Sequence, residues 1–231
     1  FPSINLKIKD VVSSWAGVRP LIHEEGKSAS EISRKDEIFE SETGLLSIAG
    51  GKLTGFRKMA EKIVDVVVKK FKMSHPETSL SSCTTHKIAL TGGVFSGAKE
   101  VKVFKCSLEK RLQQYGFDEY VAFYLVSNYG KQADSILAIY DSLEDHNIYE
   151  RFIKAECEFD IQNEMVYNLR DFFIRRTGRL YFDIDSVKYL QDTVADYMAN
   201  KFGWSEAVKN KELDLLQQEI LDVSKFENVQ S

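Results

Sequence analysis

The spacing of hydrophobic residues changes near Leu53, and this change predicts two kinds of structure. Residues 45–49 (LLSIA) form a short apolar run that is typical of a buried strand. From Leu53 to Phe71, apolar residues recur on one helical face, at positions 56, 60, 63, 67 and 71. Gly50, Gly51 and Lys52 join the two patterns, so this stretch predicts a strand, a glycine turn and a helix.

The lysine that follows the two glycines has two interpretations. A turn before a helix can aim backbone N–H groups and a cation at an electron-rich ligand. An ordinary strand-to-helix turn with a solvated lysine gives the same pattern. On the pattern alone we favour this second interpretation.

The segments before this turn predict β-structure. Residues 4–22 mix alternating apolar positions with Gly17 and Pro20, which indicates strands and turns. We expect a hairpin around a turn at Ser41–Gly44, with arms at Ile38–Phe39 and Leu45–Ala49.

The second half of the chain predicts helices. Residues 74–98 are rich in Ser and Thr and contain Pro76, which is a linker composition. From Lys99 onward the segments have helical length, and glycines at 116, 130 and 203 mark helix ends, while Ser205 is a candidate N-cap. The fold class is therefore an α+β chain, mainly α, with β segments in residues 1–73, a linker in 74–98 and an all-α domain in 99–231.

Composition limits the partners. The 231 residues carry a formal charge of −4, which argues against nucleic acid as the main partner. Cys83, Cys106 and Cys157 lack a paired spacing, so reduced thiols and no metal site are expected, although Cys83 and His86 form a weak C-x-x-H match. No apolar run approaches the roughly 20 residues needed to span a bilayer.

A cluster of arginines in DFFIRRTGRLYF has two interpretations. Arg175, Arg176 and Arg179 could hold a phosphate or a partner protein. The favoured alternative is a helix-end cluster that pairs with acidic neighbours. The aromatic residues around it are most simply core residues.

Four motifs in order resemble one family across nearly the whole chain. They are SSWAGVRPLI (13–22), SRKD (33–36), AGGKLTGFRKMAE (49–61) and NEMVYNLRDFFIRRTGRLYFD (163–183). Together they resemble the C-terminal part of the FAD-dependent glycerol-3-phosphate dehydrogenases, which belong to the D-amino-acid-oxidase-like flavoproteins. The last motif resembles the helical C-terminal domain of that family.

The resemblance implies roles for residues in the first three motifs. It places Arg19 beside the flavin and the substrate, and gives Arg34 a part in holding the substrate phosphate. It places Lys52 against the pyrimidine end of the flavin ring, with the backbone around Lys52 completing the contact. The implied cofactor-binding residues are Gly50, Gly51, Lys52, Leu53 and Thr54, and the implied catalytic residues are Lys52 and Arg19.

A dinucleotide fingerprint is missing from the sequence. GGVFSG (92–97) does not have the G-x-G-x-x-G spacing that binds a pyrophosphate. We therefore expect a C-terminal fragment of a longer FAD enzyme, inactive alone because FAD binding and the catalytic base require the preceding portion.

The resemblance also implies partners and a location. The implied enzyme oxidises glycerol 3-phosphate to dihydroxyacetone phosphate and passes electrons to the quinone pool. The implied location is cytoplasmic, with peripheral association at the inner face of the membrane, and an oligomer is compatible with the sequence. Two alternatives remain open: a glycerol-3-phosphate oxidase that uses O₂, and a non-catalytic helical interaction module.

Overall fold

The computed structural model describes residues 4–18, 36–50 and 52–225. The chain forms two compact units: Phe1–Ala16 with Leu90–Ser231, here the helical unit, and Gly17–Ala89, here the hairpin unit. The mainly α fold predicted from the sequence is confirmed. The strands are β1 (Glu37–Glu40) and β2 (Leu46–Ala49), and the α-helices are α1 (Phe56–Ser74), α2 (Ala98–Gln114), α3 (Glu119–Tyr129), α4 (Ala133–Ser142), α5 (Ile148–Asn163), α6 (Arg179–Phe182), α7 (Ile184–Phe202) and α8 (Glu206–Ser224).

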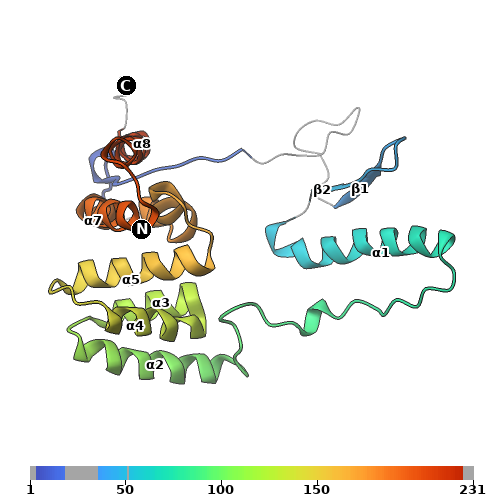
Figure 1. Cartoon of the computed structure of the whole chain (residues 1–231), viewed down its shortest axis with the longest axis horizontal. Coiled ribbons are helices and arrows are strands. Elements are labelled where there is room, and N and C mark those ends of the chain that lie inside the picture. The colour runs from blue at the N-terminus through green and yellow to red at the C-terminus, as the bar shows by residue number, and fades with distance from the viewer. Residues whose placement is uncertain (1–3, 19–35, 51, 226–231) are drawn as a thin grey trace. The chain divides into compact units, whose positions relative to one another are not determined.

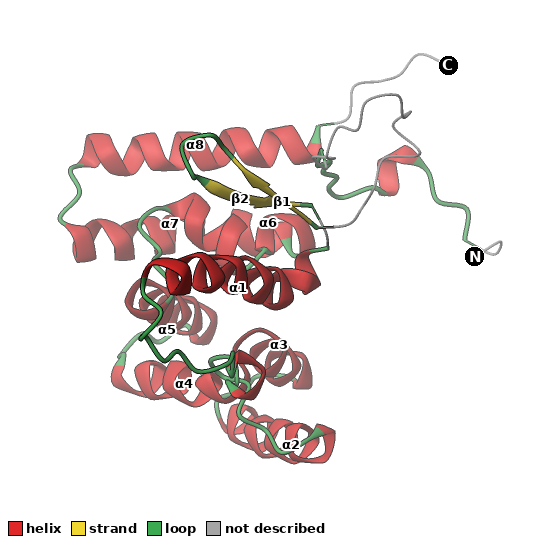
Figure 2. Ribbon diagram, turned by 90° about the vertical axis from the view of Figure 1, so that its right-hand side faces the viewer, coloured by secondary structure: helices red, strands yellow, loops and turns green. Residues whose placement is uncertain are grey.

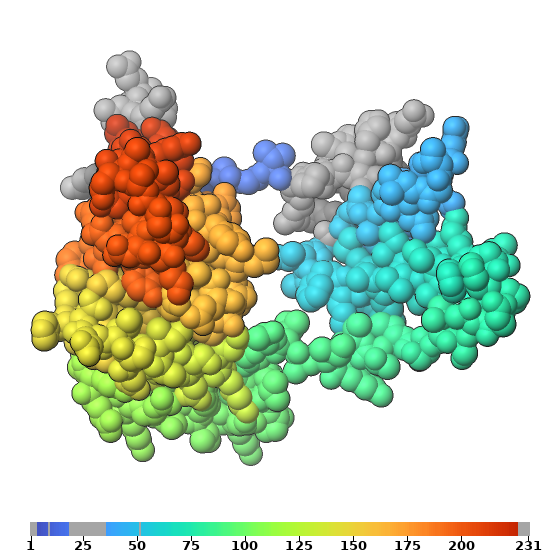
Figure 3. All heavy atoms as spheres, viewed as in Figure 1, coloured from blue at the N-terminus to red at the C-terminus, as the bar shows by residue number. Residues whose placement is uncertain are grey.

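Helix α5 is the centre of the helical unit. It lies between α2, α3 and α4 on one side and α7 and α8 on the other (Figures 1 and 3). Phe152 and Phe159 join a core with α2–α4, while Ile153 and Cys157 join a second core with α6–α8. Because its apolar side chains enter both cores, α5 connects them.

Local capping chemistry sets several helix ends. Asp118 accepts hydrogen bonds from the Tyr120 and Val121 N–H groups and begins α3, which ends before Gly130. The α7 helix ends at Gly203 in the left-handed region, and the Ser205 hydroxyl caps α8. The predicted helix ends at Gly130 and Gly203 and the predicted Ser205 N-cap are confirmed.

The segment between α5 and α7 was not predicted. Asp171–Arg176 is π-helical, and the Thr177 N–H donates to the Phe172 carbonyl at 3.0 Å. The wider π turn lets the successive residues Phe172 and Phe173 both enter the core. Gly178 then adopts φ +64°, which glycine accepts readily, and the short helix α6 begins at Arg179.

The hairpin unit contains one antiparallel sheet of two strands. Glu37 pairs with Ala49 and Glu40 with Leu46, and the Gly44 N–H donates to the Ser41 carbonyl in the turn. This confirms the predicted hairpin. The sheet contacts α1, and ion pairs from Lys62 to Asp36 and from Lys70 to Glu40 link the hairpin to the helix.

Two predictions about the β region were wrong. Residues 45–49 were expected to be buried, but Leu45 is 66% exposed, and Leu46 and Ile48 are half-buried. Two strands and one helix bury little surface. Strands were expected in residues 4–22, but the described part, 4–18, contains a 3₁₀ turn at Ile8–Asp10 and no strand.

Helix α8 lies along α7 (Figure 2) and contributes Leu216 to the second core. A substitution on α8 therefore tests how this core is packed. Leu216 is fully buried, whereas Val208 on the same helix is 42% exposed. Leu216→Ala should lower the free energy of unfolding by about 2–5 kcal/mol, because it leaves a cavity. Val208→Ala should cost roughly 0.5 kcal/mol or less. Equal losses in urea titrations would contradict the assigned packing.

Candidate functional site

The turn between β2 and α1 presents its residues to solvent. Gly50 has φ +96°, a conformation that favours glycine. Lys52 is extended and exposed, and it leads into a 3₁₀ turn at Leu53–Gly55 that continues as α1. Leu53 is 90% exposed, and Thr54 is also exposed. The structure therefore brings Gly50, Lys52, Leu53 and Thr54 together at the start of a long helix.

The electrostatics of this turn suit an electron-rich ligand. Backbone N–H groups at the start of a helix lack intrahelical acceptors, and the helix dipole is positive there. The Lys52 ammonium adds a full positive charge. Arg19, Arg34 and Gly51, the other residues expected at this site, lie outside the described residues.

Helix α1 carries an apolar face that is not buried within the hairpin unit. Phe56, Val64 and Val67 are 56%, 54% and 48% exposed, and no residue of α1 is buried. An amphipathic helix normally buries such a face. A row of exposed apolar side chains therefore begins at the Lys52 turn, and such a row is typical of a surface that other protein covers.

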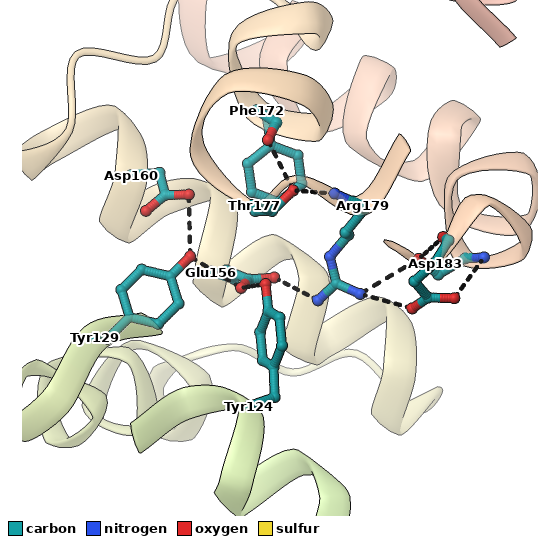
Figure 4. Close-up of polar contacts among 9 residues, drawn as sticks. Tyr124, Tyr129, Glu156, Asp160, Phe172, Thr177, Arg179 and Asp183 are labelled. Atoms are coloured by element: carbon teal, nitrogen blue, oxygen red, sulfur yellow. Dashed lines mark hydrogen bonds and ion pairs between the residues drawn. The ribbon is translucent and has the colours of Figure 1, made fainter. Parts of the chain in front are cut away.

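A second polar group lies inside the helical unit, on α5. Glu156, Glu158 and Asp160 lie on the same helix, and all three acidic residues are buried. A buried carboxylate requires hydrogen bonds or a counter-charge. Figure 4 shows how Glu156 and Asp160 meet the side chains of α3 and α6.

Glu156 is paired with Arg179. The Arg179 Nη2 group donates to Glu156 Oε2 at 2.8 Å, and the hydroxyls of Tyr124 and Tyr129 donate to Oε1 at 2.5 and 2.9 Å. The Arg179 guanidinium also lies over the Tyr124 ring, 4.8 Å from its centroid. Burial opposes the arginine charge, but the attraction of Glu156 outweighs it and raises the pKa of Arg179.

Asp160 is a buried carboxyl of a different kind. Burial, together with the negative charge of Glu156, raises the pKa of Asp160 to about 8. Its Oδ2 lies 3.3 Å from the Tyr129 hydroxyl, whose single proton is used by Glu156 at 2.9 Å. A neutral Asp160 can supply its own proton to the Tyr129 oxygen, so the protonated form suits this position.

Glu158 points to α7 instead. It accepts hydrogen bonds from Tyr197 at 2.7 Å and from Lys201 at 2.6 Å. Burial favours its neutral form, but these donors, Lys201 first, outweigh burial and hold the pKa of Glu158 below its usual range. The carboxylates of Glu156 and Glu158 thus bind side chains from the helices on both sides of α5.

A small pocket of about 220 Å³ opens beside Arg179. Nearly half of its lining residues are aromatic, among them Phe117, Tyr124 and Phe152. The Arg179 Nη1 group faces Asp183 and Ser186 at 3.3 Å each. Since these oxygens and Glu156 already bind Arg179, we assign the arginine a structural role. All residues that line the pocket belong to the helical unit.

The arginine cluster largely follows the favoured interpretation. Arg175 binds Asp171 at 2.6 Å, and Arg179 binds Glu156 and Asp183, so the predicted pairing with acidic neighbours is confirmed for both. Arg176 donates from Nε to the Glu164 carbonyl. The partnership with Glu156, 23 positions away along the chain, was not predicted.

The described residues contain no group of three or more potential metal ligands. All three cysteines are free thiols. Burial raises the pKa of the Cys157 thiol, which makes it a poor nucleophile.

Comparisons with known proteins point to one family. The model of the C-terminal domain of alpha-glycerophosphate oxidase matches residues 83–209. The aerobic glycerol-3-phosphate dehydrogenase of Bacillus subtilis (strain 168) is 44% identical over 219 residues, which is 94% of this chain and 39% of that protein. The enzyme of the same name from Staphylococcus aureus (strain USA300) is 45% identical over 208 residues, which is 90% of this chain and 37% of that protein.

A solved structure gives the same result. The glycerol-3-phosphate dehydrogenase from Bacillus halodurans, complexed with FAD, matches with a TM-score of 0.80 and 36% identity. The match covers 97% of this chain and 42% of that chain. The chain therefore spans about two fifths of the length of the curated relatives it matches.

The buried Asp160 generates a prediction about pH. Its folded pKa of about 8 lies above the ordinary value of 3.8, so the folded state holds an extra proton between these values. The stabilisation that this extra proton gives is complete below about pH 4. It is lost as the pH rises to about 8, and the free energy of unfolding then falls by up to roughly 1.4 kcal/mol per pH unit. Asp160→Asn, which stays neutral, should flatten this loss in urea titrations between pH 5 and 8.

A matched control is Asp192→Asn, since Asp192 is exposed. It should keep the pH dependence of the unmodified chain. If Asp160→Asn and the unmodified chain lose stability with the same slope, the buried neutral carboxyl is contradicted.

Proposed function

We propose a function from the premise that the chain belongs to the family of the C-terminal domain of alpha-glycerophosphate oxidase. The chain is the C-terminal part of an FAD-dependent enzyme that oxidises sn-glycerol 3-phosphate to dihydroxyacetone phosphate. The observation that carries the proposal is the match of 97% of the chain to an FAD-complexed glycerol-3-phosphate dehydrogenase.

The residues around Lys52 fit the edge of a flavin. Gly50 keeps side-chain atoms away from the turn, and the exposed Leu53 and Thr54 leave the backbone accessible. Bound FAD supplies the chemistry of hydride acceptance from C2 of the substrate. The strand, turn and helix around Lys52 belong to the part of the enzyme that holds this cofactor.

Lys52 has a catalytic role in this proposal. Its ammonium and the N–H groups at the start of the helix face the negative charge that develops during hydride transfer. Such groups accelerate a reaction when they bind the transition state more tightly than the ground state. Lys52 therefore acts on the rate of the chemical step more than on substrate affinity.

Two arginines complete the proposed site. Arg19 lies beside the substrate, and Arg34 binds the substrate phosphate. A guanidinium suits a phosphate because its donors bind two oxygens at once. We assign the remaining cofactor contacts and the catalytic base to parts of the enzyme outside this chain.

The identity of the molecule that accepts the electrons is a separate part of the proposal. We propose the quinone pool as the acceptor, reached by peripheral association of the whole enzyme with the membrane. The relatives are named dehydrogenases and not oxidases, which is compatible with an acceptor other than O₂. The family description favours the alternative, an oxidase that uses O₂. None of the helices in the described residues has the length and apolarity needed to cross a membrane.

Anaerobic flavin reduction in the full-length enzyme tests the function. Glycerol 3-phosphate should bleach the flavin absorbance. Lys52→Ala should slow this bleaching by roughly 100-fold to 1,000-fold, as removal of an oxyanion-hole donor does, with a smaller change in substrate affinity. The exposed Lys69 on α1 offers a control, and Lys69→Ala should leave the rate unchanged.

A flavin that stays oxidised with glycerol 3-phosphate would contradict the substrate. Bleaching at the same rate in Lys52→Ala and the unmodified enzyme would contradict the role of Lys52. Reoxidation by O₂ or by a soluble quinone then separates the two acceptors.

A further inference from the structure

The pocket of about 220 Å³ in the helical unit has no part in the proposed function. It opens where the two cores meet on α5. Phe152 belongs to the core shared with α2–α4, Ile153 belongs to the core shared with α6–α8, and both line the pocket. Further lining residues come from α3, α6 and α7. Side chains from four helices thus meet at one cavity.

The buried part of the lining is apolar. Phe117, Phe152 and Leu190 are each more than nine-tenths buried, and Ile153 is fully buried. The Phe117 ring lies 5.5 Å from the Phe152 ring, measured between centroids. This lining favours a ligand with an apolar body, because the removal of apolar surface from water is favourable.

Three tyrosines from three helices form the rim of the pocket. Tyr120, Tyr149 and Tyr189, here the rim tyrosines, are 59%, 53% and 63% exposed. Tyr149 also packs edge-to-face against Phe117, with 5.8 Å between the ring centroids. Single exposed aromatic residues are ordinary on a protein surface. Three that converge on one cavity form a patch, and such patches are typical of binding sites.

The charged residues of the lining leave the pocket negative. Asp118 and Asp183 carry one negative charge each, and Arg179 carries the single positive charge of the lining. The fully buried Glu156 lies 2.8 Å from Arg179 and neutralises it. The two aspartates are therefore a surplus of negative charge beside aromatic rings.

Both aspartates can accept further hydrogen bonds. The Asp118 Oδ1 atom caps α3, and no donor among the described residues bonds to its Oδ2 atom. Asp183 accepts from the Arg179 Nη1 group at 3.3 Å and from the Ser186 N–H at 3.4 Å (Figure 4). Both distances exceed the usual range of about 2.7–3.2 Å, so these bonds are weak. The aspartates are thus open to a charged ligand.

Arg179 shows that this site already holds one cation against an aromatic ring. Its guanidinium lies 4.8 Å from the centroid of the Tyr124 ring. The face of an aromatic ring is negative and attracts a cation. In the part of the chain that the structure describes, cations lie over Phe95, Tyr140 and Tyr124 and over none of the rim tyrosines. The rim rings are therefore available to a cation from outside the chain.

We propose that this pocket binds a small organic cation, an ammonium group with an apolar body. The ammonium lies against the rim tyrosines and is neutralised by Asp118 and Asp183, while the apolar body contacts the buried lining. Proteins recognise quaternary ammonium groups with aromatic cages of this kind. The proposal does not depend on the proposed function, since all of its residues lie in the helical unit.

The size and charge of the pocket limit the ligand. A volume of about 220 Å³ exceeds that of an engineered cavity of roughly 150 Å³ that holds benzene. It lies below the range of about 300–1,000 Å³ that is typical of pockets for larger ligands. A phosphate or a carboxylate would face the two aspartates, so an anion does not fit. These limits leave a small cation.

Choline is the probe for the test, because it carries a quaternary ammonium on a small body. Its neutral isostere, 3,3-dimethylbutan-1-ol, has the same shape without the charge. Both compounds are titrated by calorimetry into the full-length enzyme with oxidised FAD and no substrate. Choline should bind roughly tenfold more tightly than the alcohol, because the rings and the aspartates favour the charge.

Tyr149 tests the contribution of the rings. Tyr149→Leu removes the ring but keeps an apolar side chain, and it should raise the dissociation constant of choline by roughly threefold to tenfold. Tyr149→Phe keeps the ring and should bind choline as the unmodified enzyme does. Tyr167 is 63% exposed and does not line the pocket, so Tyr167→Leu is the matched control and should leave choline binding unchanged.

Asp118 tests the contribution of the charge. Asparagine caps a helix as well as aspartate does, so Asp118→Asn keeps the start of α3 and removes one negative charge. It should weaken choline binding by a similar factor and leave the binding of the alcohol unchanged. Asp214→Asn removes an exposed charge on α8, outside the pocket, and should change neither.

Several outcomes would overturn the proposal. Choline that does not bind, or that binds no more tightly than the alcohol, contradicts a cation site. Equal binding of choline to Tyr149→Leu and Tyr167→Leu contradicts its location at this pocket. Should Tyr149→Leu fail to fold, Asp118→Asn decides the question. Flavin reduction by glycerol 3-phosphate is a separate measurement, so failure of the proposed function leaves this test intact.

Discussion

The ion pair between Arg179 and Glu156 is the interaction on which the helical unit depends. Both groups are buried, and Glu156 lies on α5, the helix shared by the two cores. Removal of one partner of a buried pair typically costs about 3–5 kcal/mol, because it leaves the other charge uncompensated. The π-helical turn and the left-handed Gly178 deliver Arg179 to this position. This unusual backbone segment thus places two aromatic rings in the core and one buried charge beside its partner.

The sequence predicts those features that depend on neighbouring residues. The helix ends at Gly130 and Gly203 and the Ser205 cap follow from local chemistry, and so does the hairpin around Ser41–Gly44. The sequence alone does not identify Glu156 and Asp160 as buried acidic residues, since their partners come from α3 and α6. Their spacing in the stretch ECEFD, with acidic residues at every second position of a helix, was the available signal, because it places acidic groups on more than one helical face.

The candidate flavin site shows a different limit of sequence-based prediction. The motif around Lys52 predicts a strand, a glycine turn and a helix, and the structure contains them. It does not predict how far they are buried, because burial of α1 depends on further protein that would cover its apolar face. The roles of Arg19, Arg34 and Lys52 stay predictions. The contrast between a closed helical core and an open α1 face supports a chain that completes a larger enzyme.

Amide hydrogen exchange is the most direct test of this central claim. It should be measured by mass spectrometry on this chain alone and on the full-length enzyme with FAD. Because exchange follows local burial and packing, we expect α5 to be strongly protected in both proteins. We expect α1 to exchange rapidly in the chain alone and to become as protected as α5 in the full-length enzyme. Equal protection of α1 in both proteins would contradict the claim that its exposed face is completed by the rest of the enzyme.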